Sequence, residues 1–307
     1  MISLTKTDRH NLRRKLINTG WKTLIIRKHA KLSLDNSRVR LEYDDGEAYV
    51  PLCQIREIII ETAQCNITSA LLAEMTMLGI GVIVCDSKHN PCGTFNSLGT
   101  DSSFPGRIMD QAQWSADVKD TLWQKIIENK VNNQIDVLKR KSFAVPDELY
   151  CYYDDITPGD IHNMEGQAAR LYFNTLFGQS FNRRKDDNIN SMLNYGYSII
   201  LSGFNRIITM HGFSTVLGIN HHSRSNPFNF ACDLMEPFRP MVDELVYSKL
   251  GNELDVEMKQ SLISILYNVV SIGGRVEQVV DAMEEYLLAA IRFMSGEISD
   301  FVKVSYI

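Results

Sequence analysis

The feature that most constrains the fold is a change in hydrophobic periodicity near residue 100. From Trp21 onward, short segments rich in β-branched residues alternate with Asp-, Asn- and Gly-containing turns, as in "KTLIIRKHAKLSLDN", "SRVRLEYDDG" and "IREIIIE". Such segments are typical of strands. After residue 106 apolar residues recur at helical spacing, for example in "WSADVKDTLWQKIIENKVNNQIDVLKR". The pattern predicts an α+β protein, in which an antiparallel β-rich domain precedes a larger all-α domain.

The segment "SLGTDSSFPG", residues 97–106, concentrates Gly, Ser, Asp and Pro and is typical of a linker. We therefore expect a β-rich domain at residues 20–100 and a helical domain at residues 106–307. A basic extension, residues 1–19, precedes them. Within the helical domain the apolar spacing also predicts helices over "VEMKQSLISILYNVV" and "RVEQVVDAMEEYLLAAIRFMSG".

Composition bounds the class of protein. With 307 residues, 44% of them hydrophobic, the chain can bury a large core. Residues 1–31 carry nine Lys or Arg and one acid, whereas the net charge is −5. Charge alone favours solvated helix surfaces over a polyanion-binding face. The six cysteines form no CxxC pair and no apolar run is long enough to span a bilayer, so we expect a reducing cytoplasm and no membrane partner.

Chemistry-bearing residues gather in "HHSRSNPFNFACDLMEPFRP", which begins at His221 and contains Asp233 and Glu236. If a helix covers "DLMEPF", these two carboxylates are three residues apart on one face. Glu165 lies in "NMEGQAARLYF", behind an Asn that can cap a helix. Carboxylates with one imidazole suit a divalent cation and phosphoryl chemistry.

Ordinary structural roles explain the same four residues. Glu236 can be a first-turn carboxylate favoured by the helix dipole, and Asp233 can be a helix cap. His221 can be a hydrogen-bonded loop residue, and Glu165 can be ordinary helix surface. Zinc motifs such as HExxH are absent. Spacing alone therefore leaves a metal site open.

The ordered segments "GWKTLIIRKHAKLSL", "EGQAARLYF", "DNINSMLNYGYSIIL", "GFSTVLGINHH" and "FNFACDLMEPFRPMVDELV" resemble the CRISPR-associated integrase family, the Cas-one family. Members are the larger subunit of the complex that captures foreign DNA and installs it as new spacers. The form "NPFNFACDLMEPFRP" is similar to members from type II systems, which also encode an RNA-guided effector nuclease.

The resemblance implies a site. By motif, Glu165, His221 and Glu236 match the family's metal ligands, and Asp233 matches an acidic position that supports them. All four are therefore candidate catalytic residues. His221 is chosen over its neighbour because the family's histidine follows the glycine of its turn by three residues, and here that glycine is Gly218. Many members have Asp where this chain has Glu236, and members of this type usually begin near residue 20.

The resemblance also implies an activity. A metal-dependent DNA integrase and endonuclease, using Mn²⁺ or Mg²⁺, joins the 3′-hydroxyl ends of captured double-stranded DNA to the repeat array by transesterification. The imidazole favours Mn²⁺. Expected partners are a second copy of the chain and a small ferredoxin-like subunit in a heterohexamer-type complex; the effector nuclease and accessory adaptation proteins are further candidates. The alternatives are a structure-specific endonuclease without integration and a non-catalytic DNA-binding scaffold.

Contacts to DNA should come chiefly from Lys and Arg on phosphates, with aromatic rings stacking on bases or sugars. For each basic candidate the alternative is plain surface charge, and for each tyrosine it is packing between helices. The DNA-binding candidates are Arg183, Arg184, Lys185, Arg224, Arg239, Tyr195 and Tyr197.

Overall fold

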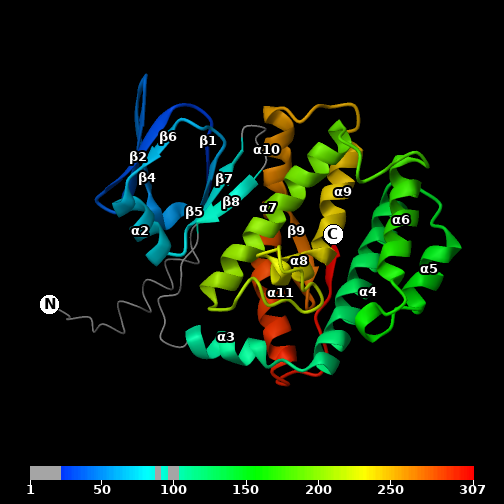
Figure 1. Cartoon of the computed structure of the whole chain (residues 1–307). Helices are drawn as coiled ribbons and strands as arrows, with labels where there is room; N and C mark the ends of the chain where they lie inside the picture. Colours follow the sequence, from blue (N-terminus) through cyan, green and yellow to red (C-terminus); the bar gives the residue numbers. More distant parts are fainter. Residues whose placement is uncertain (1–21, 87–90, 96–103) are drawn as a thin grey trace. The chain divides into compact units, whose positions relative to one another are not determined.

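The computed structural model describes residues 22–86, 91–95 and 104–307. The chain divides into two compact units, residues 1–102 and 103–307. Figure 1 shows that strands dominate the first unit and helices the second. The α+β class predicted from the change in periodicity is confirmed.

The predicted basic extension, residues 1–19, and residues 97–103 of the predicted linker lie outside the described residues. Among the helices that are described, none combines the length and the apolar character needed to cross a bilayer.

The described residues of the first unit form two four-stranded sheets, one α-helix and one short 3-10 helix. The sheets have the strand orders β1-β5-β7-β8 and β4-β3-β2-β6. The elements are β1 (Lys22–Ile26), β2 (Ala30–Asp35), β3 (Arg38–Tyr43), β4 (Gly46–Pro51), η1 (Leu52–Gln54), β5 (Ile55–Ile60), β6 (Cys65–Ile67), α2 (Ser69–Met77), β7 (Gly81–Cys85) and β8 (Pro91–Phe95).

Both sheets are mixed, so the expectation of an antiparallel domain was wrong. β5 pairs parallel with β1 and with β7, and β2 pairs parallel with β6. Parallel neighbours need a crossover, and the segment that holds β6 and α2 supplies one between β5 and β7. The continuous apolar run of β5, in which Ile58, Ile59 and Ile60 are all buried, is typical of a parallel strand covered on both faces.

Local signals set the turns of this unit. Asn36 and Ser37 both have positive φ and join β2 to β3, as a two-residue hairpin requires. Thr68 caps α2 by accepting a hydrogen bond from Leu71 N at 3.4 Å, and Gly79 follows the helix with a φ of 69°. The cap and the glycine thus fix both ends of this helix.

The second unit is mainly helical. Two long helices, α4 with 25 residues and α7 with 23, run through it (Figure 1). The elements are α3 (Phe104–Ala112), α4 (Ala116–Arg140), α5 (Asp147–Asp154), η2 (Pro158–Asp160), α6 (Met164–Phe177), α7 (Asn188–Met210), α8 (Asn229–Leu234), η3 (Glu236–Phe238), α9 (Arg239–Ser248), α10 (Val256–Ser264), η4 (Ile265–Tyr267), β9 (Val269–Ile272), β10 (Arg275–Gln278), α11 (Val279–Met294) and β11 (Val304–Tyr306).

This unit is not all-α, because it also holds a three-stranded sheet of order β10-β9-β11. The predicted helices over residues 256–270 and 275–296 are each partly strand. Gly273 and Gly274 both have positive φ and form the turn of the β9–β10 hairpin. The two helices α10 and α11 therefore flank a hairpin.

Candidate functional site

The helix α4 brings a buried lysine to the centre of the site. Lys130 is 6% exposed, and its Nζ lies 2.5 Å from Oε1 of Glu165 and 2.5 Å from Oε2 of Glu236. The two carboxylate oxygens are therefore no farther apart than twice that distance. Two acids that are remote in sequence, one on α6 and one on η3, thus converge on one point.

The position of Glu165 is fixed by the turn that precedes α6. Asp160 accepts hydrogen bonds from the backbone N–H of Met164 at 2.8 Å and of Glu165 at 3.0 Å. Asn163 caps the helix through Gly166 N at 3.3 Å. Asp160 and Asn163 both have positive φ, a conformation that costs free energy in residues other than Gly and persists where the surroundings enforce it. The first turn of α6 is thereby held in one geometry.

Glu236 is 1% exposed and sits between two cations. Its Oε1 lies 3.1 Å from Arg239 Nη2, and its Oε2 faces Lys130. Burial opposes ionisation of this carboxyl, but the charges of Arg239 and Lys130 outweigh it and lower the pKa of Glu236. Burial lowers the pKa of Lys130, but the charges of Glu165 and Glu236 outweigh this effect and raise it. Glu236 and Lys130 therefore keep their charges in spite of their burial.

His221 is oriented by Asp233. Asp233 is fully buried on α8, and its Oδ1 lies 2.5 Å from His221 Nδ1. Its oxygens also accept the backbone N–H groups of Ile219, Asn220 and His221 at 2.5 to 3.1 Å. Burial raises the pKa of Asp233 and these hydrogen bonds oppose it. Asp233 thus fixes the backbone of residues 219–221 as well as the orientation of the His221 ring.

Gly218 permits this close approach. A Cβ at this position would lie 2.7 Å from Asp233 Oδ2 and would also collide with the His221 carbonyl oxygen. Gly218, which the motif used to choose His221 over His222, is therefore required at this position for steric reasons. His222, by contrast, is exposed, and its ring contacts the carbonyl oxygen of Asn220 at 2.8 Å.

His221 lies within electrostatic reach of both glutamates. Its pKa is raised, first by the hydrogen bond to Asp233 and against the effect of partial burial; the charges of Glu236 and Glu165 add to the rise. Trp123 on α4 packs its ring edge-on against the imidazole, with centroids 5.7 Å apart. The structure thus brings three predicted ligands, Glu165, His221 and Glu236, into one neighbourhood.

The donor set suits a hard divalent cation. Within residues 22–86, 91–95 and 104–307 no three His, Cys, Asp or Glu side chains are grouped at ligand positions, and the Lys130 ammonium stands between the two glutamates. Glu236 Oε2 is buried near that ammonium but lacks a partner with hydrogen-bond geometry, so it has lone pairs to offer. Asp233 engages Nδ1 of His221, which leaves Nε2 for a ligand.

The basic candidates differ in how they are held. Arg184 and Lys185 are exposed between α6 and α7, and Arg224 is exposed in the loop after His221. Arg183 is half-buried; it hydrogen-bonds Asn190 and, at 2.8 Å, Asn194. Three of the predicted phosphate contacts are therefore accessible, and Arg183 is engaged within the protein.

The two candidate tyrosines also differ. Tyr195 is fully buried, with Lys259 Nζ 5.7 Å from its ring centroid. Its ring cannot stack on a base, so packing between helices, the alternative considered for it, is correct. Tyr197 lies against two guanidinium groups, those of Arg183 at 5.4 Å and Arg239 at 5.2 Å, and donates a hydrogen bond to Asp243.

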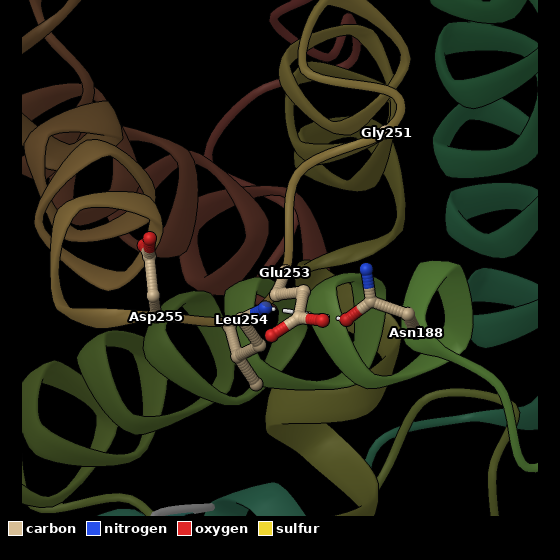
Figure 2. Close-up of a pocket in the computed structure, with 5 residues that line it drawn as sticks. All are labelled: Asn188, Gly251, Glu253, Leu254 and Asp255. Atoms are coloured by element: carbon tan, nitrogen blue, oxygen red, sulfur yellow. Dashed lines mark hydrogen bonds between the residues drawn. The ribbon is translucent and has the colours of Figure 1, made fainter.

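Figure 2 shows a pocket of about 450 Å³. It is lined by Asn188 at the start of α7 and by Gly251, Glu253, Leu254 and Asp255 before α10. Asn188 Oδ1 accepts the Leu254 N–H at 3.2 Å, and Asp255 caps α10. These contacts join two helix starts, and no predicted site residue lines the pocket.

Sequence reasoning missed Lys130 and Asp160. Lys130 occupies a position four residues after Ile126 and seven after Trp123, on the buried face of α4. A lysine in such an apolar stripe signals an acidic partner. Asp160 precedes the capping Asn163 by three residues, and its neighbour Gly159 marks a turn.

The profile of the family described as CRISPR associated protein Cas1 matches residues 23–259. A CRISPR-associated endonuclease Cas1 from Neisseria meningitidis serogroup C (strain 8013) is 33% identical over 258 residues, which is 82% of this chain and 85% of that protein. The range that the profile matches includes the candidate ligands Glu165, His221 and Glu236.

Solved structures share the fold. A casposase bound to integration product superposes with a TM-score of 0.75 at 19% identity, covering 92% of both chains. A chain of a Cas6-RT-Cas1–Cas2 complex gives 0.73 at 19% identity over 91% of this chain and 35% of its own. The family resemblance read from the motifs is confirmed: this chain belongs to the CRISPR associated protein Cas1 family.

Proposed function

We propose that this protein is a metal-dependent DNA integrase and endonuclease of CRISPR adaptation. The observation that carries the proposal is the convergence of Glu165 and Glu236 on a single cation position, with His221 beside them. Membership of the Cas1 family supports it, as does the likeness to a casposase bound to integration product.

Each residue of the proposed site has a distinct role. Glu165, Glu236 and Nε2 of His221 would hold a Mn²⁺ or Mg²⁺ ion, whose chemistry is to polarise the attacked phosphate and neutralise charge on its oxygens. Asp233 holds the imidazole in one orientation. A mixed carboxylate and imidazole set favours Mn²⁺. Arg184, Lys185 and Arg224 are accessible for phosphates.

In this proposal the substrates are double-stranded DNA with 3′-hydroxyl ends and a repeat array. The 3′-hydroxyl oxygen attacks a phosphodiester of the array and gives up its proton; a new P–O bond forms, the old one breaks, and the leaving oxygen takes up a proton. The number of phosphodiesters is conserved, so no nucleotide is hydrolysed. Integration at both ends of one fragment requires two sites, for which a homodimer with a small ferredoxin-like partner provides the symmetry.

The test offers a duplex with 3′-hydroxyl ends and a repeat-bearing plasmid to the protein with its small partner, in Mn²⁺, Mg²⁺ or EDTA. Joined products are expected with either metal and none in EDTA. Fragments without joined products would favour the second candidate, a structure-specific endonuclease, which the name of the Neisseria relative favours. If Glu165→Ala leaves every activity of the complex unchanged, the protein is a scaffold.

A further inference from the structure

Lys130 has an unusual setting for a lysine. It is 6% exposed, it belongs to the apolar face of α4, and its Nζ has two carboxylate oxygens at 2.5 Å. A buried ammonium is unfavourable unless it is paired. Here both partners come from other segments, so the amine ties α4 to α6 and to η3.

The charges of this cluster balance without any added ion. Glu165 and Glu236 carry two negative charges, and Lys130 and Arg239 carry two positive ones. Arg239 is held in place, because its guanidinium bonds Glu236 Oε1 and lies 5.2 Å from the Tyr197 ring centroid. A divalent cation between the carboxylates would therefore leave an excess of positive charge unless the ammonium withdraws. The flexible lysine chain is the group able to do so.

We propose that Lys130 is a positioning residue: it holds Glu165 and Glu236 together before a divalent cation binds, and it competes with that cation for the same two carboxylates. The inference rests on the metal site of the proposed function. It assigns a role to a residue of α4 that is not itself a ligand. Two measurable properties follow, one for each half of the proposal.

The test compares the full-length wild type with K130M by thermal unfolding in EDTA and by calorimetric titration with MnCl₂. Without the lysine the two carboxylates repel each other, so the metal-free Tm is expected to fall by several degrees. Removing the competing positive charge is expected to tighten the Mn²⁺ Kd by about tenfold. Saturating Mn²⁺ should then raise the Tm of K130M more than that of the wild type.

Two control variants isolate the charge. K130R keeps the positive charge and is expected to keep a Kd near the wild-type value. K125M makes the same chemical change on the same helix, at a lysine whose Nζ lies 3.8 Å from the exposed Asp300, and should alter neither property. An unchanged or weaker Kd in K130M, or equal tightening in K130R, overturns the proposal.

If K130M does not fold in EDTA, refolding in Mn²⁺ is expected to recover it while K130R folds in EDTA; failure of Mn²⁺ to recover it overturns the proposal. Strand joining, measured separately, distinguishes the two levels of inference. Tightened Mn²⁺ binding without joining sinks the proposed function and leaves the role of Lys130 standing. Strand joining with no change in the Mn²⁺ Kd of K130M overturns the role of Lys130 and leaves the proposed function standing. A wild type that binds no Mn²⁺ rules out the role of Lys130.

Discussion

Two buried carboxyl groups of the second unit, Glu236 and Asp243, lie seven residues apart and behave in opposite ways. Each is 1% exposed. Burial acts against ionisation of both, but Glu236 contacts two cations and its pKa is lowered. Asp243 accepts a hydrogen bond from the Tyr197 hydroxyl, and burial raises its pKa to about 7. Contact with a cation, more than depth, decides whether a buried carboxyl is charged.

The difference separates the proposed metal site from a structural cluster. The cluster of Glu165, Lys130 and Glu236 pairs two carboxylates with one ammonium and is the proposed cation site. Asp243 accepts a hydrogen bond from the Tyr197 hydroxyl, its raised pKa allows it to hold a proton near pH 7, and the pair joins α7 to α9. Arg239 touches both, since it pairs with Glu236 and lies against Tyr197. Four experiments can break or sharpen this contrast.

The largest effect should come from neutralising each carboxylate in turn. Glu236→Gln removes a charged ligand and is expected to abolish detectable strand joining in the gel assay. Asp243→Asn, the matched change in the structural cluster, should keep joining within a few-fold of wild type. Similar losses in both variants would erase the distinction.

The second effect concerns which of the two adjacent histidines belongs to the proposed metal site. His221→Ala is expected to lower the joining rate by more than about 100-fold. That loss exceeds the usual loss when a residue that only hydrogen-bonds a metal ligand is mutated. Duplex binding should persist. The control, His222→Ala, changes an exposed ring and should cost little. Equal losses from the two would refute the choice of His221.

The third effect is a pH dependence of stability from Asp243. Its pKa is about 7 when folded and 3.8 in its ordinary setting, so the unfolded chain releases this proton first as pH rises. Stability from this group is complete below about pH 4 and is lost as pH rises to about 7, by at most roughly 4 kcal/mol at 1.4 kcal/mol per pKa unit.

Asp243→Asn resembles the neutral form and lacks that slope. Urea unfolding of both proteins at pH 4.5 and pH 8 should show the variant gaining relative to the wild type at the higher pH. Parallel profiles would mean that Asp243 is already ionised in the folded protein, as Glu236 is.

The smallest effect separates structural from accessible cations. Arg184→Glu with Lys185→Glu should weaken duplex binding and reduce the magnitude of the salt slope by about 2. Arg183→Met, at the guanidinium held by Asn194 and Tyr197, should chiefly lower the Tm. Arg292→Glu on α11 is the surface control. Unchanged DNA binding in the double variant would exclude this loop from the interface.

Local sequence signals predicted much of the fold. The helical periodicity predicted α4, and the Asn163 cap predicted before Glu165 is found at the start of α6. The hairpin at Gly273 and Gly274 had a recognisable turn signal too, but the apolar residues around it fit a helical spacing equally well. The continuous apolar run of β5 was a local signal for parallel pairing, but strand direction also depends on where the crossover through α2 returns the chain.

The sequence by itself determined the helical character of α4, the cap of α6 and, through motifs, the family and the four acidic and imidazole candidates. Only the tertiary structure decided that Lys130 stands between Glu165 and Glu236, that Asp233 holds a loop together, and that Tyr195 is inaccessible. The reason is physical: periodicity fixes which face of a helix is buried, whereas the partner across that face is set by how α4, α6 and η3 pack together.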